Sequence, residues 1–251
     1  MARIGLQLYT VRDEAEKDFF GTIKKVAEVG YEGVEFAGYF GASFWELKKV
    51  LNETRLEAIS TTVPMHDLVD GTKLEEAIVY SKEIDCPIII CPILPQEYRG
   101  SETMYNRAAE IFNSVGEKCN NRSLNFLYHI HGVEFENFNG KTGMEILMKK
   151  TDPEKVGFEL DVYWVEYAGV NSVEYLKKYG KRCSLIHFKD MKDRVGKRDT
   201  EVGEGVIDVA ALVNQARKFN IGWYVVEQEE FNMPPMESIV ISYKNLEKYN
   251  K

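Results

Sequence analysis

The chain has 251 residues, of which 44% are hydrophobic and 29% are charged, the balance of an ordinary soluble globular protein. Its formal net charge is −8, and a negative surface repels phosphate backbones, so we expect no nucleic-acid partner. The first residues show no signal-peptide pattern, and no apolar run approaches the ~20 residues of a membrane span. We therefore expect a cytoplasmic protein without a membrane partner.

Short apolar runs alternate with amphipathic stretches, a pattern typical of parallel strands joined by helices. The expected strands are 4–9, 33–36, 57–63, 88–91, 125–131, 156–161, 184–188 and 223–227. The expected helices are 19–28, 44–52, 74–84, 101–120, 144–150, 173–179, 209–218 and 236–249. An open doubly wound sheet normally has fewer strands, and a complete barrel has ~250 residues. The sequence therefore predicts an α/β fold, a single parallel (β/α)8 TIM-barrel domain over residues 1–251.

Ligand-type side chains gather at the expected C-terminal ends of strands five to eight, where such a barrel holds its active site. They are His129, His131, Asp161, His187 and Glu227. A mixed set of imidazoles and carboxylates suits a divalent ion such as Mn, Co, Zn or Mg. Because the side chains come from different strands, the rigid barrel would fix their geometry.

These residues also have structural interpretations. A single strand histidine is more often a hydrogen-bonded core residue, but His129 and His131 are two apart and share one face of their strand. Asp161 and Glu227 end apolar strands, where a buried carboxylate is costly unless it is paired or binds a metal. For Asp161 the competing roles are a helix cap and an ion pair.

Other charged residues near the strand ends allow two roles each. Lys189 could transfer a proton or form a simple ion pair with Asp190, and His66 could face the site or the surface. Glu229 and Glu230 are interpreted as a solvated charge run. The segment 203–205, Gly-Glu-Gly, predicts either a turn or a mobile lid.

Several short segments together resemble the sugar phosphate isomerase/epimerase family with the xylose isomerase-like barrel. These segments are 5–12 (GLQLYTVR), 30–36 (GYEGVEF), 128–135 (YHIHGVEF), 159–164 (ELDVYW), 187–191 (HFKDM), 202–205 (VGEG) and 226–228 (VEQ). The resemblance spans nearly the whole chain. It implies the fold more strongly than the substrate, because the family name covers many reactions.

The resemblance implies a divalent metal ion, with Asp161, His187 and Glu227 at ligand positions of strands six to eight. Strand five departs from the pattern of the ketose epimerases, which place a glutamate where Tyr128 stands here. The branch that this chain most resembles reads Tyr-His-Asn-His. Either His129 or His131 is therefore the fourth ligand, and His129 is the first choice.

From the resemblance we expect a metal-dependent isomerase or epimerase acting on a small ketose, keto-sugar or cyclitol derivative. The expected proton transfer takes place next to a metal-bound carbonyl. The candidate proton-transfer groups are Glu227, His131, Glu134 and Lys189. The residues expected to shape the substrate pocket are Gln7, Tyr9, Glu35, His66, Trp164 and Glu204.

Three other functions stay open. The first is a lyase, such as an inosose-type dehydratase, which the departure at strand five permits. The second is an abasic-site endonuclease, which shares this barrel but needs three metals and a phosphate-binding surface; the negative charge argues against it. The third is a non-catalytic sugar-binding protein. The expected partner is a small sugar-like substrate, and a homo-oligomer is allowed.

Overall fold

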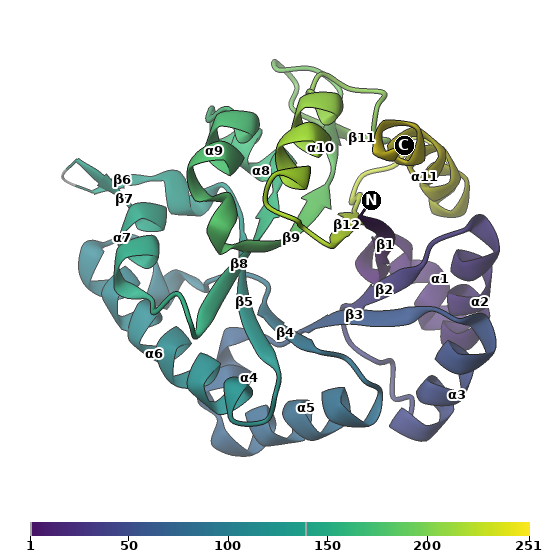
Figure 1. Ribbon diagram of the computed structural model, residues 1–251, viewed down its shortest axis with the longest axis horizontal. Helices are drawn as coiled ribbons and strands as arrows, with labels where there is room; N and C mark the ends of the chain where they lie inside the picture. Colours follow the sequence, from purple (N-terminus) through teal and green to yellow (C-terminus); the bar gives the residue numbers. More distant parts are fainter. Residues whose placement is uncertain (1, 139) are drawn as a thin grey trace.

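The computed structural model describes residues 2–138 and 140–251. Within this part of the chain, eight parallel strands close into a barrel with the helices outside (Figure 1). The barrel strands are β1 (Arg3–Gln7), β2 (Gly33–Phe36), β3 (Glu57–Thr62), β4 (Ile88–Cys91), β5 (Asn125–Ile130), β8 (Val156–Asp161), β9 (Cys183–Phe188) and β12 (Trp223–Val226). Neighbours follow chain order, and β1 closes the barrel by pairing with β12. The expected (β/α)8 TIM barrel is confirmed.

Helices surround the barrel on all sides in Figure 1. The helices are α1 (Arg12–Lys17), α2 (Phe19–Val29), α3 (Phe44–Thr54), α4 (Met65–Val69), α5 (Gly71–Glu83), α6 (Glu102–Asn120), α7 (Gly143–Lys150), α8 (Val162–Tyr167), α9 (Ser172–Tyr179), α10 (Val209–Arg217) and α11 (Pro235–Asn250). The 3-10 turns are η1 (Leu8–Val11), η2 (Gln96–Tyr98), η3 (Val133–Phe135) and η4 (Gly180–Arg182). Each expected helix is present, with its ends shifted by a few residues.

The sequence patterns missed the short elements at the strand ends. These are α1, α4, α8 and two hairpins, β6 (Asn137–Phe138) with β7 (Lys141–Thr142) and β10 (Asp190–Met191) with β11 (Asp199–Thr200). Strand one also ends earlier than expected, because the side-chain carbonyl of Gln7 accepts the backbone N–H of Tyr9 and begins η1. Tyr9 therefore leaves the strand and is 43% exposed.

Apolar side chains form one layer inside the barrel, on the N-terminal side of the polar strand ends. It consists of Ile59, Ile88, Ile90, Leu127, Leu185 and Val225. Leu127, Leu185 and Val225 each come two residues before a polar side chain of the same strand or its end, and residues two apart point to one face. The polar side chains are thus confined to the C-terminal end of the barrel. Among the described residues, no helix is long and apolar enough to cross a membrane.

Candidate metal centre

Four side chains converge at the C-terminal ends of β5, β8, β9 and β12. They are His129, Asp161, His187 and Glu227, and each offers a ligand-type atom within 4.8 Å of the others. The first three are buried, and the side chain of Glu227 is 11% exposed. These are the four residues that the sequence predicted as metal ligands. The barrel brings them together because each lies at the end of one of its strands.

The carboxylate of Asp161 has one occupied oxygen and one free oxygen. Its Oδ1 accepts the backbone N–H of Trp164 at 3.0 Å and caps α8. Its Oδ2 is buried and has no hydrogen-bond partner among the described residues; Nε2 of His129 lies 3.8 Å away. Burial raises the pKa of Asp161 to about 7. A buried oxygen without a donor is costly, and a bound cation would satisfy it, so the site fits a divalent ion.

Two further glutamates support the histidines from inside the barrel. Nδ1 of His129 lies 2.6 Å from Oε2 of Glu159. Nε2 of His187 lies 2.9 Å from Oε1 of Glu35 and 3.1 Å from Oε1 of Glu159. Glu159 was not among the predicted site residues. The signal for it is its position two residues before Asp161, which places both carboxylates on the inner face of β8.

The electrostatic surroundings shift the pKa values of His129 and His187 in opposite directions. Burial and the neighbouring His187 lower the pKa of His129 to about 3, so this ring is neutral. Burial also lowers the pKa of His187, but the carboxylates of Glu159 and Glu35 outweigh it and hold the pKa well above its ordinary value. The ring of His187 therefore carries a positive charge until a cation displaces one of its two protons.

A cavity of about 380 Å³ opens above the four residues. The cavity is lined by Gln7, Tyr9, Glu35, Ala37, Thr62, Pro92, Ile93, His129, His131, His187, Glu227 and Glu229. Its volume lies at the small end of the range for small-molecule pockets, roughly 300–1,000 Å³. Gln7, Tyr9 and Glu35 lie where the sequence analysis expected pocket residues.

His131 and Trp164 form one wall near the cavity. Their ring centroids are 5.4 Å apart, and the ring of His131 lies 4.6 Å from that of His129. Nδ1 of His131 and Nε1 of Trp164 are buried without a hydrogen-bond partner among the described residues. Burial lowers the pKa of His131 well below its usual value, so the ring is neutral and free to bind a ligand.

Asp161, Trp164 and Lys189 lie beside the cavity without lining it, and three other expected site residues point away from it. Glu134 turns away from it, because its carboxylate accepts the hydroxyl of Tyr128 and the backbone N–H of His131. His66 is exposed on α4, since β3 ends earlier and presents Thr62 to the cavity instead. Glu204 is exposed and accepts a hydrogen bond from Asn245 at 2.9 Å.

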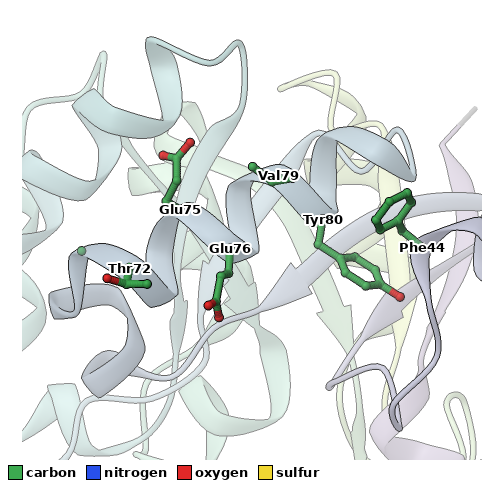
Figure 2. A pocket seen from close by; sticks show the side chains of 7 residues that line it. Phe44, Thr72, Glu75, Glu76, Val79 and Tyr80 are labelled. Carbon is green, nitrogen blue, oxygen red and sulfur yellow. The ribbon is translucent and has the colours of Figure 1, made fainter.

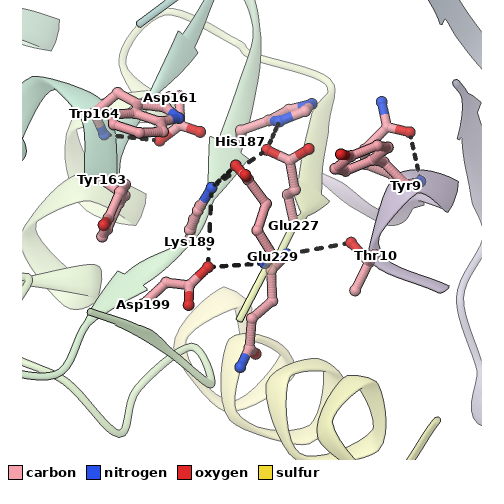
Figure 3. Close-up of polar contacts among 12 residues, drawn as sticks. Tyr9, Thr10, Asp161, Tyr163, Trp164, His187, Lys189, Asp199, Glu227 and Glu229 are labelled. Carbon is pink, nitrogen blue, oxygen red and sulfur yellow. Dashed lines mark hydrogen bonds and ion pairs between the residues drawn. The ribbon is translucent and has the colours of Figure 1, made fainter. Parts of the chain in front are cut away.

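Lys189 is buried beside the cavity and does not pair with Asp190. Its ammonium binds Glu229 and lies 4.0 Å from the carboxylates of Glu227 and Asp199 (Figure 3). The alternative of a simple ion pair between Lys189 and Asp190 is therefore wrong, and so is the interpretation of Glu229 as a solvated charge. The rings of Tyr163 and Trp164 lie 4.9 and 5.1 Å from the ammonium.

Asp190 instead holds the segment that follows the β10–β11 hairpin. Its carboxylate accepts backbone N–H groups of Met191, Gly203, Gly205 and Ile207. A Cβ atom at Gly205 would lie 2.3 Å from Oδ1 of Asp190, so only glycine permits this close approach. The segment 203–205 is thus a fixed turn, and the lid interpretation is not supported.

A second hollow lies outside the barrel between α3 and α5 (Figure 2). It is lined by Phe44, Gly71, Thr72, Glu75, Glu76, Val79 and Tyr80. Its two acidic residues are paired at the surface, Glu75 with Arg122 and Glu76 with Lys73. The side chains that could bind a metal or transfer a proton converge in the barrel cavity and not here.

The fold and the cluster at its strand ends define a (β/α)8 barrel with a candidate metal centre under a small cavity. The family model described as xylose isomerase-like TIM barrel matches residues 23–249, and the chain belongs to this family. Proteins similar to this chain carry the names of sugar-processing enzymes.

One curated relative is the inosose dehydratase of Clostridium botulinum (strain Alaska E43 / Type E3). It is 26% identical over 260 residues, which cover 86% of this chain and 83% of that protein. The crystal structure of a sugar phosphate isomerase/epimerase from Parabacteroides distasonis ATCC 8503 has a TM-score of 0.85 at 24% identity, over 100% of this chain and 96% of that chain. The crystal structure of IOLI protein with a zinc atom has a TM-score of 0.78 at 14% identity, over 99% and 98% of the two chains. The two solved structures share the fold with this chain.

Proposed function

We propose that this chain is a divalent-metal-dependent enzyme that removes a proton next to the carbonyl of a small polyhydroxylated ketone. The substrate would be a ketose, a keto-sugar or a keto-cyclitol. The observation that carries the proposal is the free, buried Oδ2 of Asp161 within a cluster of two imidazoles and two carboxylates at the floor of the cavity. Dehydration of a keto-cyclitol and epimerisation of a ketose both begin with this proton loss, and the names of the relatives describe these reactions.

The metal would be held by His129, Asp161, His187 and Glu227. When bound, it supplies a Lewis acid that polarises the carbonyl and stabilises the negative charge left by the departing proton. Mn, Co, Zn and Mg all suit the donor set, and the related IOLI protein contains zinc. The hydroxyl and amide groups of Thr62, Tyr9 and Gln7 line the cavity and would orient the hydroxyls of the substrate.

Glu227 is the candidate base. Burial raises its pKa, but Lys189 and His187 outweigh this effect and hold the pKa well below its usual range. The carboxylate is thus ionised at neutral pH and faces the cavity. Lys189, whose ammonium lies 4.0 Å from Oε2 of Glu227, keeps the base anionic inside a buried site. Glu229 and the rings of Tyr163 and Trp164 cover the ammonium of Lys189, so we assign this lysine the role of keeping Glu227 ionised and not that of a proton-transfer group.

The second proton-transfer group decides the reaction. Proton return on the other face of the substrate would give an isomerase or epimerase, and loss of a neighbouring hydroxyl would give a lyase. A pair of carboxylates would suit proton return, but Glu134 is bound to Tyr128, Glu35 to His187 and Glu229 to Lys189. Among the described residues that follow β5, His131 faces the cavity. A carboxylate base beside a neutral imidazole suits elimination of water, because the carboxylate can pass the abstracted proton to the departing hydroxyl while the imidazole orients that hydroxyl by a hydrogen bond. We therefore favour the lyase.

An isomerase or epimerase remains the second candidate. It is favoured by the likeness to the sugar phosphate isomerase/epimerase structure, and His131 would then exchange the proton on the second face. In that reaction Glu227 and His131 would act in turn as base and acid.

An assay in D2O separates the two reactions. Protein loaded with zinc, manganese or cobalt is incubated with inososes and with ketoses, and the products are followed by NMR and by ultraviolet absorbance. A lyase yields an unsaturated ketone that absorbs in the ultraviolet, whereas an isomerase or epimerase gives deuterium at the carbon next to the carbonyl with no loss of water. Metal-loaded protein that does neither with any of these substrates would contradict the proposal.

Metal content supplies the second test. The variant with Asp161→Ala and Glu227→Ala is expected to purify with little bound metal, while Glu134→Gln, a buried carboxylate outside the cavity, is the matched control. Unchanged metal content in the double variant would overturn the proposed function.

A further inference from the structure

One buried carboxylate contacts both histidines of the candidate centre. Glu159 is 0% exposed, and its two oxygens face different rings. Oε2 lies 2.6 Å from Nδ1 of His129, and Oε1 lies 3.1 Å from Nε2 of His187. Among the described residues, Oε2 of Glu159 shares a hydrogen bond with His129, whereas Oε1 has the contact with His187 and no hydrogen-bond partner. Burying a carboxylate is costly without polar contacts, and the two rings supply them.

The contacts fix which nitrogen of each ring keeps its proton when a metal binds. An ionised carboxylate only accepts hydrogen bonds, so the nitrogen that faces it must be the N–H. In His129 this is Nδ1, and the opposite atom, Nε2, points toward Asp161 at 3.8 Å. In His187 it is Nε2, which Glu35 and Glu159 both face, and the opposite atom, Nδ1, lies 3.3 Å from Glu227 and gives up its proton when a cation binds. The two rings therefore present different nitrogens to the centre.

Glu35 adds a second contact to only one of the rings. Its Oε1 lies 2.9 Å from Nε2 of His187. The same carboxylate is held by Nε2 of Gln7 at 2.5 Å and by the hydroxyl of Ser60. The N–H of His187 is thus hydrogen-bonded to Glu35 and lies beside Glu159, whereas the N–H of His129 has Glu159 alone. Loss of Glu159 would affect both rings, and loss of Glu35 would affect one.

We propose that Glu159 is a positioning residue that holds the two histidines in opposite tautomers. His129 then binds the metal through Nε2 and His187 through Nδ1. This inference rests on the metal site of the proposed function. Partners that orient a ligating histidine in this way typically change metal affinity 10–100-fold when they are removed.

Nitrogen-15 NMR of histidine tests the tautomers directly. The chain has four histidines, so a long-range proton–nitrogen spectrum of protein with selectively labelled histidine and bound Zn²⁺ contains few signals. The variants His66→Gln and His131→Gln assign the two rings outside the ligand set. We expect a protonated Nδ1 in one ligating ring, that of His129, and a protonated Nε2 in the other. Zinc bound through the same type of nitrogen in both rings would overturn the inference.

The variant Glu159→Gln tests the positioning role. A glutamine offers one acceptor oxygen and an NH2 group with two donors, so it cannot present an acceptor to both rings. We expect its Zn²⁺ affinity, measured by competition with a chromophoric chelator, to fall ~10–100-fold. Glu35→Gln should cause a smaller loss, and Glu134→Gln should cause none. Circular dichroism of each variant checks folding, and the wild-type spectrum tests the tautomers even if Glu159→Gln does not fold.

The outcomes separate this inference from the proposed function. Zinc affinity in a folded Glu159→Gln variant equal to that of the wild type would overturn the positioning role and leave the metal site intact. Failure of the wild type to bind zinc would overturn the proposed function, and the positioning role with it.

Discussion

The ammonium group of Lys189 binds the carboxylate of Glu229, and the lysine is only 2% exposed. The pair closes one side of the candidate centre, where Glu227 and Asp199 add two more carboxylates at 4.0 Å (Figure 3). Burial opposes a charged lysine, but the carboxylates of Glu227, Asp161 and Glu229 outweigh it and raise the pKa of Lys189 above the ordinary value. The lysine is therefore the counter-charge that allows several acidic groups to be buried together.

Lys189→Met should therefore destabilise the fold. The methionine fills a similar volume but leaves Glu227 and its acidic neighbours without their buried counter-charge. We expect the free energy of unfolding to fall by about 3 kcal/mol, the usual cost of breaking a buried ion pair. Urea denaturation at neutral pH measures it. The control is Lys192→Met, an exposed lysine of the β10–β11 hairpin, for which a change within about 0.5 kcal/mol is expected. Equal midpoints for both variants would show that Lys189 is not needed as a counter-charge.

Metal binding should stabilise the folded protein through Asp161. Saturating zinc at about 100 times its Kd adds about 2.7 kcal/mol to the free energy of unfolding, so the Tm should rise on loading and fall after chelation. Asp161→Asn keeps a side-chain oxygen that can accept the N–H of Trp164 and cap α8, but it loses the charged free oxygen. The zinc-dependent rise in Tm should then largely disappear, while the Tm of the metal-free variant stays near that of the metal-free wild type. The same zinc-induced rise in the variant would exclude Asp161 as a ligand.

The pH dependence of stability should report on Glu134. Burial raises the pKa of Glu134 to about 7 from its ordinary value of 4.5, so the folded state binds a proton that the unfolded state has released. This contribution is complete below the unfolded pKa and is lost as pH rises through about 7. Relative to Glu134→Gln, the wild type should lose about 2 kcal/mol between pH 5 and pH 8. Parallel stability curves for the two proteins would contradict this assignment.

His131 and His66, the two histidines outside the ligand set, provide a test variant and its matched control for catalysis. His131→Gln removes the unpartnered Nδ1 beside the cavity and should lower kcat about 100-fold, the usual contribution of a general acid or base. Metal affinity should stay unchanged, because Glu159 and not His131 contacts the ring of His129 through a hydrogen bond. His66→Gln changes an exposed histidine on α4 and should leave kcat as it is. Full activity of His131→Gln would remove it from the mechanism.

The barrel could be predicted from the sequence because the pattern of its strands is strong. Runs such as Ile88–Cys91 are apolar on both faces, and they alternate with long amphipathic helices such as α6. The short elements were missed for a physical reason. Helices α1, α4 and α8 have a turn or so each, and they depend on caps and tertiary contacts that leave little periodicity in the sequence.

The ligand cluster could also be predicted, because strand order alone brings strand ends together. The placement of side chains beyond the ends of the strands could not be predicted. Tyr128 donates a hydrogen bond to Glu134 on the outer side of β5, and Lys189 donates one to Glu229 and not to the adjacent Asp190. Both choices depend on which face a side chain takes after the regular alternation of the strand has ended. Glu159 could have been found, since the period of two applies within β8.

The hydrogen bond from Trp164 to Asp161 has a consequence for the binding equilibrium itself. Because helix α8 already fixes the rotamer of this side chain, the conformational entropy of the aspartate is lost during folding and not when an ion arrives. The free oxygen is therefore preorganised. The amide proton of Trp164 belongs to the same hydrogen bond, so its exchange rate with solvent is a local reporter of whether the centre is occupied.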